Sequence, residues 1–511
     1  MSGQTRLPDA VATIPDALAF WAAATPDAPA VVPHGRPAIS YDALWRSAGG
    51  LAETLHALGV RRADRVVLLL PEGPRLAAAL LGTACAAIAL PLGAALPSAE
   101  LAAVLAGVNA AAAVADPTLP APARARLAEL GIPLLELRGG DAPTLAPVDG
   151  ARRRGPCPRP MPGDIAAVSQ SSGTTGKPKR VPYFHGGLLI SGREHRDAYG
   201  LDCRDIGIVV SPLTASLGAS MLLHSLVAGA ALLFPAALEP SRVWAAMLAE
   251  RPTWTQASAG FLELLARELR NRPATESVSL RFVRATSAAI SPEMCHELAR
   301  RLGGPVLPSY SSSEAGRISM AFPPPAKSKP GSAGRPVQPL AIVDDAGNRV
   351  GTGVEGEIWL DNPRVFAGYL DDPEATAAAL APGGWFRTGD TGFLDEDGFL
   401  FLTGRRNELI NRGGDKIAPA EVDAALLAHP AVREAAAFPA PDERYGQDIV
   451  VAVALEPGQT ASARALRTWM LERLAPHKVP RRIWFVDDLP RTATGKVQRG
   501  ELTRRWRVAL R

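Results

Sequence analysis

One stretch of nine residues combines side chains and backbone that could hold a polyanion. It runs Ser171-Ser172-Gly173-Thr174-Thr175-Gly176-Lys177-Pro178-Lys179 and contains two glycines, four hydroxyl side chains and two lysines. Glycine lets backbone N–H groups turn inward, and hydroxyl and ammonium groups add donors. The stretch is not a Walker loop, because its glycines are closer together and Pro178 disfavours a helix through Lys177. It predicts a loop that holds a nucleotide triphosphate, although taken alone a solvated turn explains it equally well.

Four further segments combine charged, hydroxyl and aromatic side chains in short runs. They are Tyr310-Ser311-Ser312-Ser313-Glu314-Ala315, Trp385-Phe386-Arg387-Thr388-Gly389-Asp390, Gly404-Arg405-Arg406-Asn407-Glu408-Leu409-Ile410 and Pro490-Arg491-Thr492-Ala493-Thr494-Gly495-Lys496. With the first loop, and in this order, they resemble the signature of the adenylate-forming enzyme superfamily. That superfamily includes acyl-CoA synthetases (AMP-dependent ligases), adenylation domains of peptide synthetases and beetle luciferases. The resemblance extends from the hydrophobic βα units near the N-terminus to Leu502.

The resemblance implies a first half-reaction that joins a carboxylate to the α-phosphate of ATP while pyrophosphate leaves. The loop Ser171–Lys179 is expected to hold the β- and γ-phosphates. Lys496 is the expected adenylation lysine, because an ammonium on a flexible stem can reach both the carboxylate and the α-phosphate oxygens. Glu314 is expected to bind a Mg²⁺ ion that bridges the phosphates, a role that suits a hard carboxylate oxygen. Lys496 and Glu314 are therefore the predicted catalytic residues, and Glu314 is also the predicted metal ligand.

The resemblance also implies which residues bind the adenine and the ribose of ATP. Tyr310 is expected to stack on the adenine. Asp390 suits the two ribose hydroxyls because an ionised carboxylate only accepts hydrogen bonds, and Arg405 adds a fork of donors for the ribose or a phosphate. The residues expected to bind ATP and coenzyme A are Ser171, Ser172, Gly173, Thr174, Thr175, Gly176, Lys177, Ala288, Ala289, Tyr310, Ser313, Asp390, Arg405 and Gly414.

Asn407 falls on the hinge position of the resemblance. The small C-terminal domain is expected to rotate there between the two half-reactions, first bringing Lys496 to the active site. The second arrangement presents the loop Arg412-Gly413-Gly414-Asp415-Lys416, whose glycine pair allows a narrow pantetheine arm to approach the backbone closely. Gly414 is therefore expected to line the pantetheine tunnel.

Several positions depart from the family pattern on the nucleotide side. Arg180 and Ser311 replace usual glycines. Pro308 stands where an amide side chain often contacts adenine, and Ala215 where histidine or an aromatic residue is common. A misplaced triphosphate lowers the rate steeply even when every charged group is present. One alternative function is therefore a thioester-forming enzyme that acts mainly on a supplied acyl-adenylate, with weak adenylation.

The expected acyl pocket consists of small or apolar side chains, which favours a bulky apolar acid of the aryl, alicyclic or fatty type. The segment Arg284-Ala285-Thr286-Ser287-Ala288 also resembles oxalate-activating relatives. Arg317 offers a partner for a second carboxylate, although a surface or ion-paired arginine is the simpler explanation. By resemblance of position, the pocket residues are Ala215, Leu217, Gly218, Met221, Ser287, Ala288, Ala289, Ile318 and Met320.

Acyl-CoA ligation is the favoured function within the superfamily. Activation of an amino acid needs a carboxylate for the substrate ammonium, and no Asp or Glu occurs from Ser211 to Leu238. A luciferase-like oxygenase has no specific support, and a non-enzymatic nucleotide-binding scaffold has no use for Lys496. We therefore expect an acid–CoA ligase (AMP-forming) that uses ATP, Mg²⁺ and coenzyme A. An oxalate-type small-acid CoA ligase and a stand-alone adenylation enzyme remain alternatives.

The composition gives no indication of nucleic-acid binding, disulfide bonds, a metal-binding pattern or a membrane span. The net charge is +4 over 511 residues, and the run Arg152-Arg153-Arg154 is better explained as a solvated linker than as a nucleic-acid patch. Four widely spaced cysteines form neither a disulfide framework nor a metal-binding pattern. Two charge-free stretches, Leu76–Ala99 and Ala215–Leu238, are broken by proline and glycine, so we expect helix-plus-strand core segments there and no membrane span. No signal peptide is evident, and we expect a cytoplasmic protein.

The alternation of apolar runs and helical patterns predicts an α/β fold. Arg65–Leu70, Ile88–Leu90 and Ala111–Ala115 are predicted strands, separated by helices, and this pattern is typical of βαβ units. Hairpins are expected around Gly347–Leu360 and Gly392–Thr403. We expect a large N-terminal nucleotide- and acyl-binding domain over residues 1–404, with βαβ layers and a β-rich segment. A hinge near 407 joins it to a small, mobile α+β domain over residues 405–511.

Overall fold

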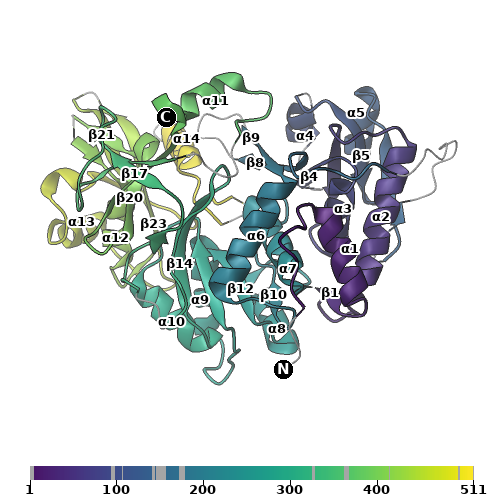
Figure 1. The fold of residues 1–511 in the computed structure, drawn as a ribbon. Helices are drawn as coiled ribbons and strands as arrows, with labels where there is room; N and C mark the ends of the chain where they lie inside the picture. The colour runs from purple at the N-terminus through teal and green to yellow at the C-terminus, as the bar shows by residue number, and fades with distance from the viewer. Residues whose placement is uncertain are drawn as a thin grey trace.

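The computed structural model describes residues 5–93, 98–105, 107–140, 144–145, 157–171, 179–324, 328–361, 367–413, 415–442, 444–492 and 495–509. These residues form four β-sheets with helices packed around them (Figure 1). The chain starts in two large sheets and ends in a small sheet at the opposite side of the molecule (Figure 1). The fold class predicted from the alternating pattern, mixed α/β with a large N-terminal and a small C-terminal domain, is confirmed.

The first sheet contains the predicted βαβ units. Its strands, in spatial order, are β7 (Thr144–Leu145), β6 (Leu134–Arg138), β5 (Ala110–Ala115), β3 (Arg65–Leu70), β4 (Ile88–Gly93), β8 (Ile165–Ser171) and β9 (Lys179–Phe184). The central strand β3 alternates between two hydrophobic clusters: Val66 and Leu68 pack on one face and Val67 and Leu69 on the other. A parallel strand covered on both faces is apolar throughout, which explains why its sequence shows no polar alternation.

Helices α1 to α5 surround this first sheet. The buried half of α2 and most of α3 face the same cluster as the even-numbered residues of β3. The helices are α1 (Ile14–Ala24), α2 (Tyr41–Ala57), α3 (Pro74–Ala84), α4 (Ser98–Leu105) and α5 (Ala121–Glu129).

The second sheet supplies the strands whose ends form the candidate site. Strands β10 to β14 run parallel and are joined by helical crossovers, while β15 returns antiparallel to β14. In spatial order the strands are β16 (Arg335–Pro336), β15 (Gly316–Met320), β14 (Val306–Ser312), β13 (Phe282–Thr286), β12 (Trp254–Ser258), β10 (Ile206–Ile208), β11 (Ala231–Phe234), β1 (Pro29–Pro33) and β2 (Ile39–Ser40).

Five helices accompany the second sheet. The hydrophobic cluster that contains Leu189 and Leu222 also contains Val31 and Leu68, so α6 and α7 pack against residues of both large sheets (Figure 1). The helices are α6 (His185–Tyr199), α7 (Ser216–Ala228), α8 (Pro240–Glu250), α9 (Ala259–Arg270) and α10 (Pro292–Leu302). The two charge-free stretches form α3 with β4 and α7 with β11, as predicted. Among the described residues, every helix is too short or too polar to span a bilayer.

A four-stranded antiparallel sheet follows, and it contains the predicted hairpin turn at residues 395–398. The Asp395 carboxylate accepts the backbone N–H groups of Asp397 and Phe399, which closes the turn. The earlier hairpin differs from its predicted position, because the strand that pairs with 356–360 lies before Gly347. The elements are β17 (Leu340–Val343), β18 (Gly356–Leu360), α11 (Pro373–Ala379), η1 (Pro382–Gly384), β19 (Phe386–Leu394) and β20 (Leu400–Arg405).

The C-terminal part forms a five-stranded sheet with its own hydrophobic clusters. Strands β23 and β24 alternate between two clusters, with Ala437 and Val451 on one side and Phe438 and Val450 on the other. The expected domain boundary after residue 404 falls at the last residue of β20 and stays a prediction. The elements are η2 (Arg406–Glu408), β21 (Ile410–Arg412), β22 (Asp415–Ile417), α12 (Pro419–Leu427), β23 (Val432–Asp442), β24 (Gly446–Leu455), α13 (Ala463–Leu471), η3 (Pro476–Lys478), β25 (Arg482–Phe485) and α14 (Arg499–Ala509).

Candidate active site

A cavity of about 670 Å³ lies where strands β13 and β14 end. The carboxyl ends of parallel strands are the usual place for a ligand in an open α/β sheet. The cavity brings together predicted residues that are far apart in the sequence and adds Lys496 from the C-terminal part. The predicted site residues in its lining are Ala215, Leu217, Ser287, Ser313, Glu314, Arg405 and Lys496.

Lys496 reaches the cavity because its loop docks on the start of α9. A Cβ atom added at Gly260 would lie 2.5 Å from the carbonyl oxygen of Gly495, so glycine is required for this approach. Arg491 donates to the same carbonyl oxygen at 2.7 Å and pairs with Glu434 at 2.9 Å. Glu434 is buried and also pairs with Arg267 of α9 at 3.0 Å. This network connects the C-terminal sheet to the large domain beside the cavity.

The chemistry of Lys496 depends on this docking. The side chain still reaches solvent. Partial desolvation, together with the neighbouring Arg405 guanidinium, lowers the pKa of Lys496 below its usual value. A lowered pKa in a cavity that holds other charged groups is typical of functional sites.

Glu314 lies between β14 and β15 and takes part in a small polar cluster. The Tyr369 hydroxyl donates to Glu314 Oε1 at 2.9 Å, and the Lys179 ammonium lies 4.5 Å from the centre of the Tyr369 ring. The neighbouring Ser313 hydroxyl lies 3.1 Å from that of Ser216 at the start of α7. Among the described residues, no group of three or more His, Cys, Asp and Glu side chains could hold a metal. The role of Glu314 as a Mg²⁺ ligand stays a prediction.

Asp390 on β19 is held by two donors. The Tyr310 hydroxyl donates to one carboxylate oxygen at 2.5 Å and the Arg405 Nε to the other at 2.6 Å. Asp390 is buried, and its charge raises the pKa of Arg405. Each carboxylate oxygen keeps a second lone pair for a further donor. The three predicted nucleoside-binding residues therefore form one hydrogen-bonded group, with Arg405 in the cavity lining and the Tyr310 ring in a hydrophobic cluster.

Several predicted residues do not line the cavity. Met221 and Met320 are buried in the cluster between the large sheets, and Ile318 is buried in a separate cluster with Tyr310. Strand alternation explains the last two, because Arg317 of β15 lines the cavity and its neighbours 318 and 320 point to the opposite face. The other described residues outside the lining are the buried Tyr310 and Asp390, Gly218, whose added Cβ would meet the Pro212 carbonyl, and the exposed Ala288 and Ala289.

Some predicted residues cannot be located. Asn407 lies in η2, and only its backbone is described, as is that of Ser171 at the end of β8. The following predicted residues lie outside the described ones: Ser172, Gly173, Thr174, Thr175, Gly176, Lys177 and Gly414.

The lining also contains polar residues that the sequence did not assign to the site. Arg284 of β13, His224 of α7 and Tyr369 are examples. These polar side chains lie in the same lining as apolar ones such as Leu217 and Leu223, and the expected apolar acyl pocket stays a prediction. The signal for Arg284 was present in its motif, but a charged residue inside an apolar strand run is ordinarily a surface residue. Its burial follows from the central position of β13 in the sheet.

Comparisons with known proteins agree with this arrangement. Residues 18–370 match the AMP-binding enzyme family, and residues 421–496 match the AMP-binding enzyme C-terminal domain. This chain belongs to the AMP-binding enzyme family. The resemblance to adenylate-forming enzymes that was read from five motifs is thereby confirmed.

Relatives of this AMP-binding enzyme carry names of CoA ligases. It is 35% identical over 492 residues to the probable CoA ligase CCL9 of Humulus lupulus, covering 93% of this chain and 92% of the relative. It is 40% identical over 344 residues to the oxalate–CoA ligase of Arabidopsis thaliana, covering 66% and 67%. The solved structure of ATP-bound MatB from Rhodopseudomonas palustris is similar, with a TM-score of 0.85, 25% identity and coverage of 97% and 100%.

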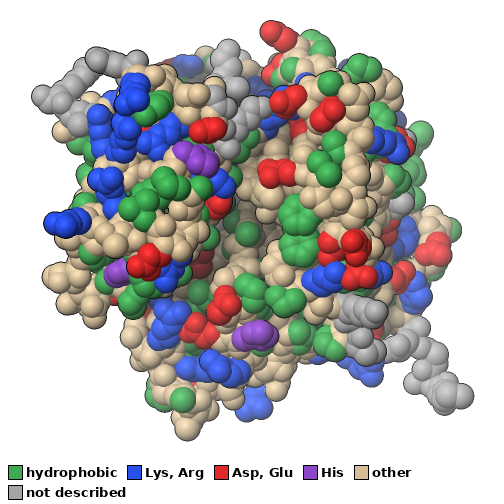
Figure 2. Space-filling view, turned by 90° about the vertical axis from the view of Figure 1, so that its left-hand side faces the viewer, with side chains coloured by type: hydrophobic (Ala, Val, Ile, Leu, Met, Phe, Trp, Pro, Cys, Tyr) green, Lys and Arg blue, Asp and Glu red, His purple; other side chains and the backbone are tan. Residues whose placement is uncertain are grey.

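The charge on the surface of this AMP-binding enzyme is mixed. Figure 2 shows Lys and Arg side chains interspersed with Asp and Glu over one face of the molecule, which is hollowed near its centre. The mixture on this face agrees with the small net charge of +4.

Filling the cavity at Ala215 tests whether this position faces the acyl group. Ala215 precedes α7 and is partly exposed, so tryptophan fits without unfolding the helix. We expect Ala215→Trp to lower kcat/KM for a bulky accepted acid by about 10-fold or more and to affect a small acid less. The matched control is Ala128→Trp at an exposed position of α5. An equal loss for acids of every size would place Ala215 outside the acyl site.

Proposed function

We propose that this chain is an acid–CoA ligase (AMP-forming) that catalyses two steps. In the first, a carboxylate oxygen attacks the α-phosphorus of ATP, and the bond to the β-phosphate oxygen breaks to release pyrophosphate. In the second, the sulfur of CoA attacks the acyl carbon and AMP leaves. The observation that carries the proposal is the position of Lys496, which lines the same cavity as Glu314 and Arg405 although it comes from the C-terminal sheet region.

The residues around the cavity have distinct roles in the first step. The Lys496 ammonium stabilises the negative charge that develops between the carboxylate and the α-phosphate. The Asp390 carboxylate accepts from ribose hydroxyls, with Arg405 and Tyr310 fixing its orientation. Glu314 holds Mg²⁺, which neutralises phosphate charge when bound. The loop Ser171–Lys179 binds the leaving phosphates.

The second step needs a different arrangement of the C-terminal part. Lys496 must leave so that the pantetheine arm of CoA can enter, and we propose that the chain turns near Asn407 at η2. Gly414 would then line the path of the arm. Domain closure of this kind is absorbed by a few residues at the end of an element.

The departures from the family pattern fit a complete two-step enzyme. The Arg180 guanidinium pairs with Asp371 at 3.2 Å, so its charge is already engaged. The Ser311 hydroxyl lies 2.9 Å from that of Thr286, and Pro308 pairs with Ala285 inside the sheet. Each residue therefore has a structural partner. These contacts favour the two-step ligase over an enzyme that works mainly on a supplied acyl-adenylate.

The deciding experiment measures the two half-reactions separately. We expect ATP–pyrophosphate exchange that depends on the acid, together with conversion of synthetic acyl-adenylate to the CoA thioester. A panel of acids with ATP and CoA, read by mass spectrometry, supplies the acid for this test. Brisk CoA capture without exchange would establish the alternative of weak adenylation. Exchange without any CoA capture would establish a stand-alone adenylation enzyme.

A further inference from the structure

The wall of the cavity formed by β13 contains a buried arginine that has no anionic partner among the described residues. Arg284 is 2% exposed and lines the cavity. Its Nη1 donates to the neutral Gln256 side chain at 3.0 Å. Its Nε and Nη2 have no hydrogen-bond partner within the part of the chain that the structure describes, and they are buried. The guanidinium charge is therefore not balanced by a carboxylate of these residues.

Gln256 fixes the position of this guanidinium. Its amide nitrogen donates to the Leu217 carbonyl oxygen at 2.7 Å and to the Ser220 hydroxyl at 2.6 Å. The amide oxygen is thereby directed toward Arg284. The two unpartnered donors, Nε and Nη2, lie on one edge of the guanidinium, the edge that binds a carboxylate or similar oxyanion in bidentate fashion.

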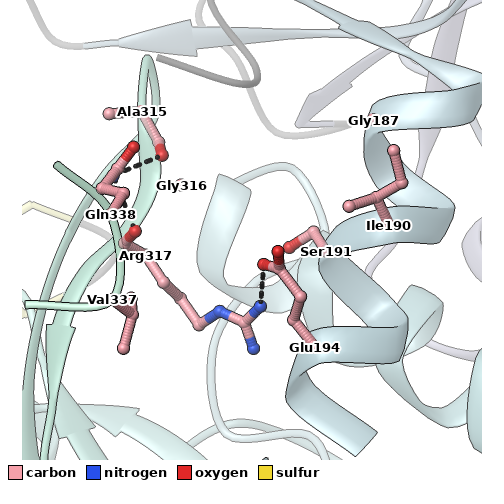
Figure 3. A pocket seen from close by; sticks show the side chains of 9 residues that line it. All are labelled: Gly187, Ile190, Ser191, Glu194, Ala315, Gly316, Arg317, Val337 and Gln338. Atoms are coloured by element: carbon pink, nitrogen blue, oxygen red, sulfur yellow. Dashed lines mark hydrogen bonds and ion pairs between the residues drawn. The ribbon is translucent and has the colours of Figure 1, made fainter. Parts of the chain in front are cut away.

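The surroundings of Arg284 destabilise its positive charge, so a bound anion would stabilise it. Arg317 of β15 also lines the cavity and reaches across to Glu194 of α6 at 2.7 Å (Figure 3). Burial, with a smaller contribution from the charge of Arg317, lowers the pKa of Arg284 to about 10, and Tyr199 acts in the other direction. No carboxylate of the described residues opposes that loss.

Two histidines complete this wall without supplying a charge. His224 lines the cavity, and its ring stacks on that of His195 at 3.9 Å. Burial lowers the pKa of both far below the usual value, so both are neutral at pH 7. Arg317 is ion-paired with Glu194, so the uncompensated positive charge of this wall comes from Arg284, and a charge in a low-dielectric wall acts strongly on whatever occupies the cavity.

We propose that Arg284 selects an acid with a second anionic group, a carboxylate or a sulfonate, at the end remote from the carboxylate that is adenylated. The inference rests on the proposed function and deepens it by naming the substrate class. It replaces the bulky apolar acid expected from the sequence with a small dicarboxylic or sulfocarboxylic acid. The Nε and Nη2 donors of Arg284 bind the distal group.

The test compares acids in pairs on the full-length wild-type chain. Each dicarboxylic or sulfocarboxylic acid is assayed with ATP, Mg²⁺ and CoA beside its monoamide or methyl analogue of the same length. We expect kcat/KM to be about 10–100-fold higher for the acid with the distal charge, as for a charge-assisted hydrogen bond. The dicarboxylic and sulfocarboxylic arms distinguish the two kinds of distal group.

Substitutions of Arg284 test whether this residue causes the preference for a distal anion. Arg284→Met keeps an unbranched side-chain stem and removes the charge and the donors, so the preference for the distal anion should fall toward unity, mainly through a higher KM for the charged acid. Arg284→Lys should restore part of the preference. Arg270→Met, at an exposed arginine of α9, is the matched control and should leave the preference intact.

The outcomes separate this inference from the proposed function. If wild type uses uncharged analogues as well as charged acids, the inference is wrong while the ligase function stands. The same conclusion follows if Arg284→Met, with unchanged Tm, lowers kcat/KM equally for both members of each pair. If no acid of either kind yields a thioester, the proposed function fails and the inference fails with it. The wild-type comparison remains decisive even if the methionine variant does not fold.

Discussion

Lys496→Ala will lower the rate of acyl-adenylate formation by about 10²–10³-fold and leave CoA capture of a supplied acyl-adenylate near the wild-type rate. Lys496 lines the cavity in the structure, where Gly495 docks on α9. Its charge acts on the carboxylate and α-phosphate, which are separate reactants in the first step alone. ATP–pyrophosphate exchange measures the first step, and thioester formation from synthetic acyl-adenylate measures the second.

The matched control for this variant is Lys478→Ala. Lys478 also lies in the C-terminal part, but it pairs with Glu421 of α12, away from the cavity lining. Removing an exposed ion pair of this kind changes stability by less than about 1 kcal/mol. Both half-reactions of the control should remain near wild type. An equal loss of both steps in folded Lys496→Ala would contradict the role given to this lysine.

The fold was predictable because its local patterns agree with its tertiary structure. The run 66–70 is apolar at every position, and β3 is covered on both faces. The turn at Asp395 has the residue types that its hydrogen bonds require. The structure brings Glu314, Arg405 and Lys496 to one cavity, although the sequence separates them by up to 182 positions.

The residues on the acyl side of the cavity were harder to predict, because side chains alternate between the two faces of a strand. A one-residue difference decides which face of β15 a side chain occupies, so Arg317 lines the cavity while Ile318 belongs to the core. Composition alone favoured the apolar residues as lining. The burial of Arg284 depends on long-range pairing of β13 with β12 and β14, which local sequence does not encode.

A substitution at Gly260 should also affect one half-reaction and spare the other, although this residue carries no reacting group. Gly260→Ala should lower ATP–pyrophosphate exchange by about 10²-fold, because a displacement of about 1 Å in a reacting assembly has that effect. The new Cβ would lie 2.5 Å from the Gly495 carbonyl oxygen and 3.0 Å from its carbon, both backbone atoms that cannot rotate away. The loop must shift, and Lys496 shifts with it. CoA capture of a supplied acyl-adenylate should be spared, since that step does not use this docking.

Stability gives an independent check on this prediction. Gly260 lies in the first turn of α9, where alanine is the better helix former by up to about 1 kcal/mol, so Tm should stay level or rise while adenylation falls. Gly50→Ala in α2 is the matched control, because nothing lies within 4 Å of its added Cβ and it gains the same helix propensity without a clash. A loss confined to adenylation in Gly260→Ala, absent from Gly50→Ala, would trace the defect to docking of the Lys496 loop. Unchanged exchange would mean that the docked arrangement is not the one in which ATP reacts.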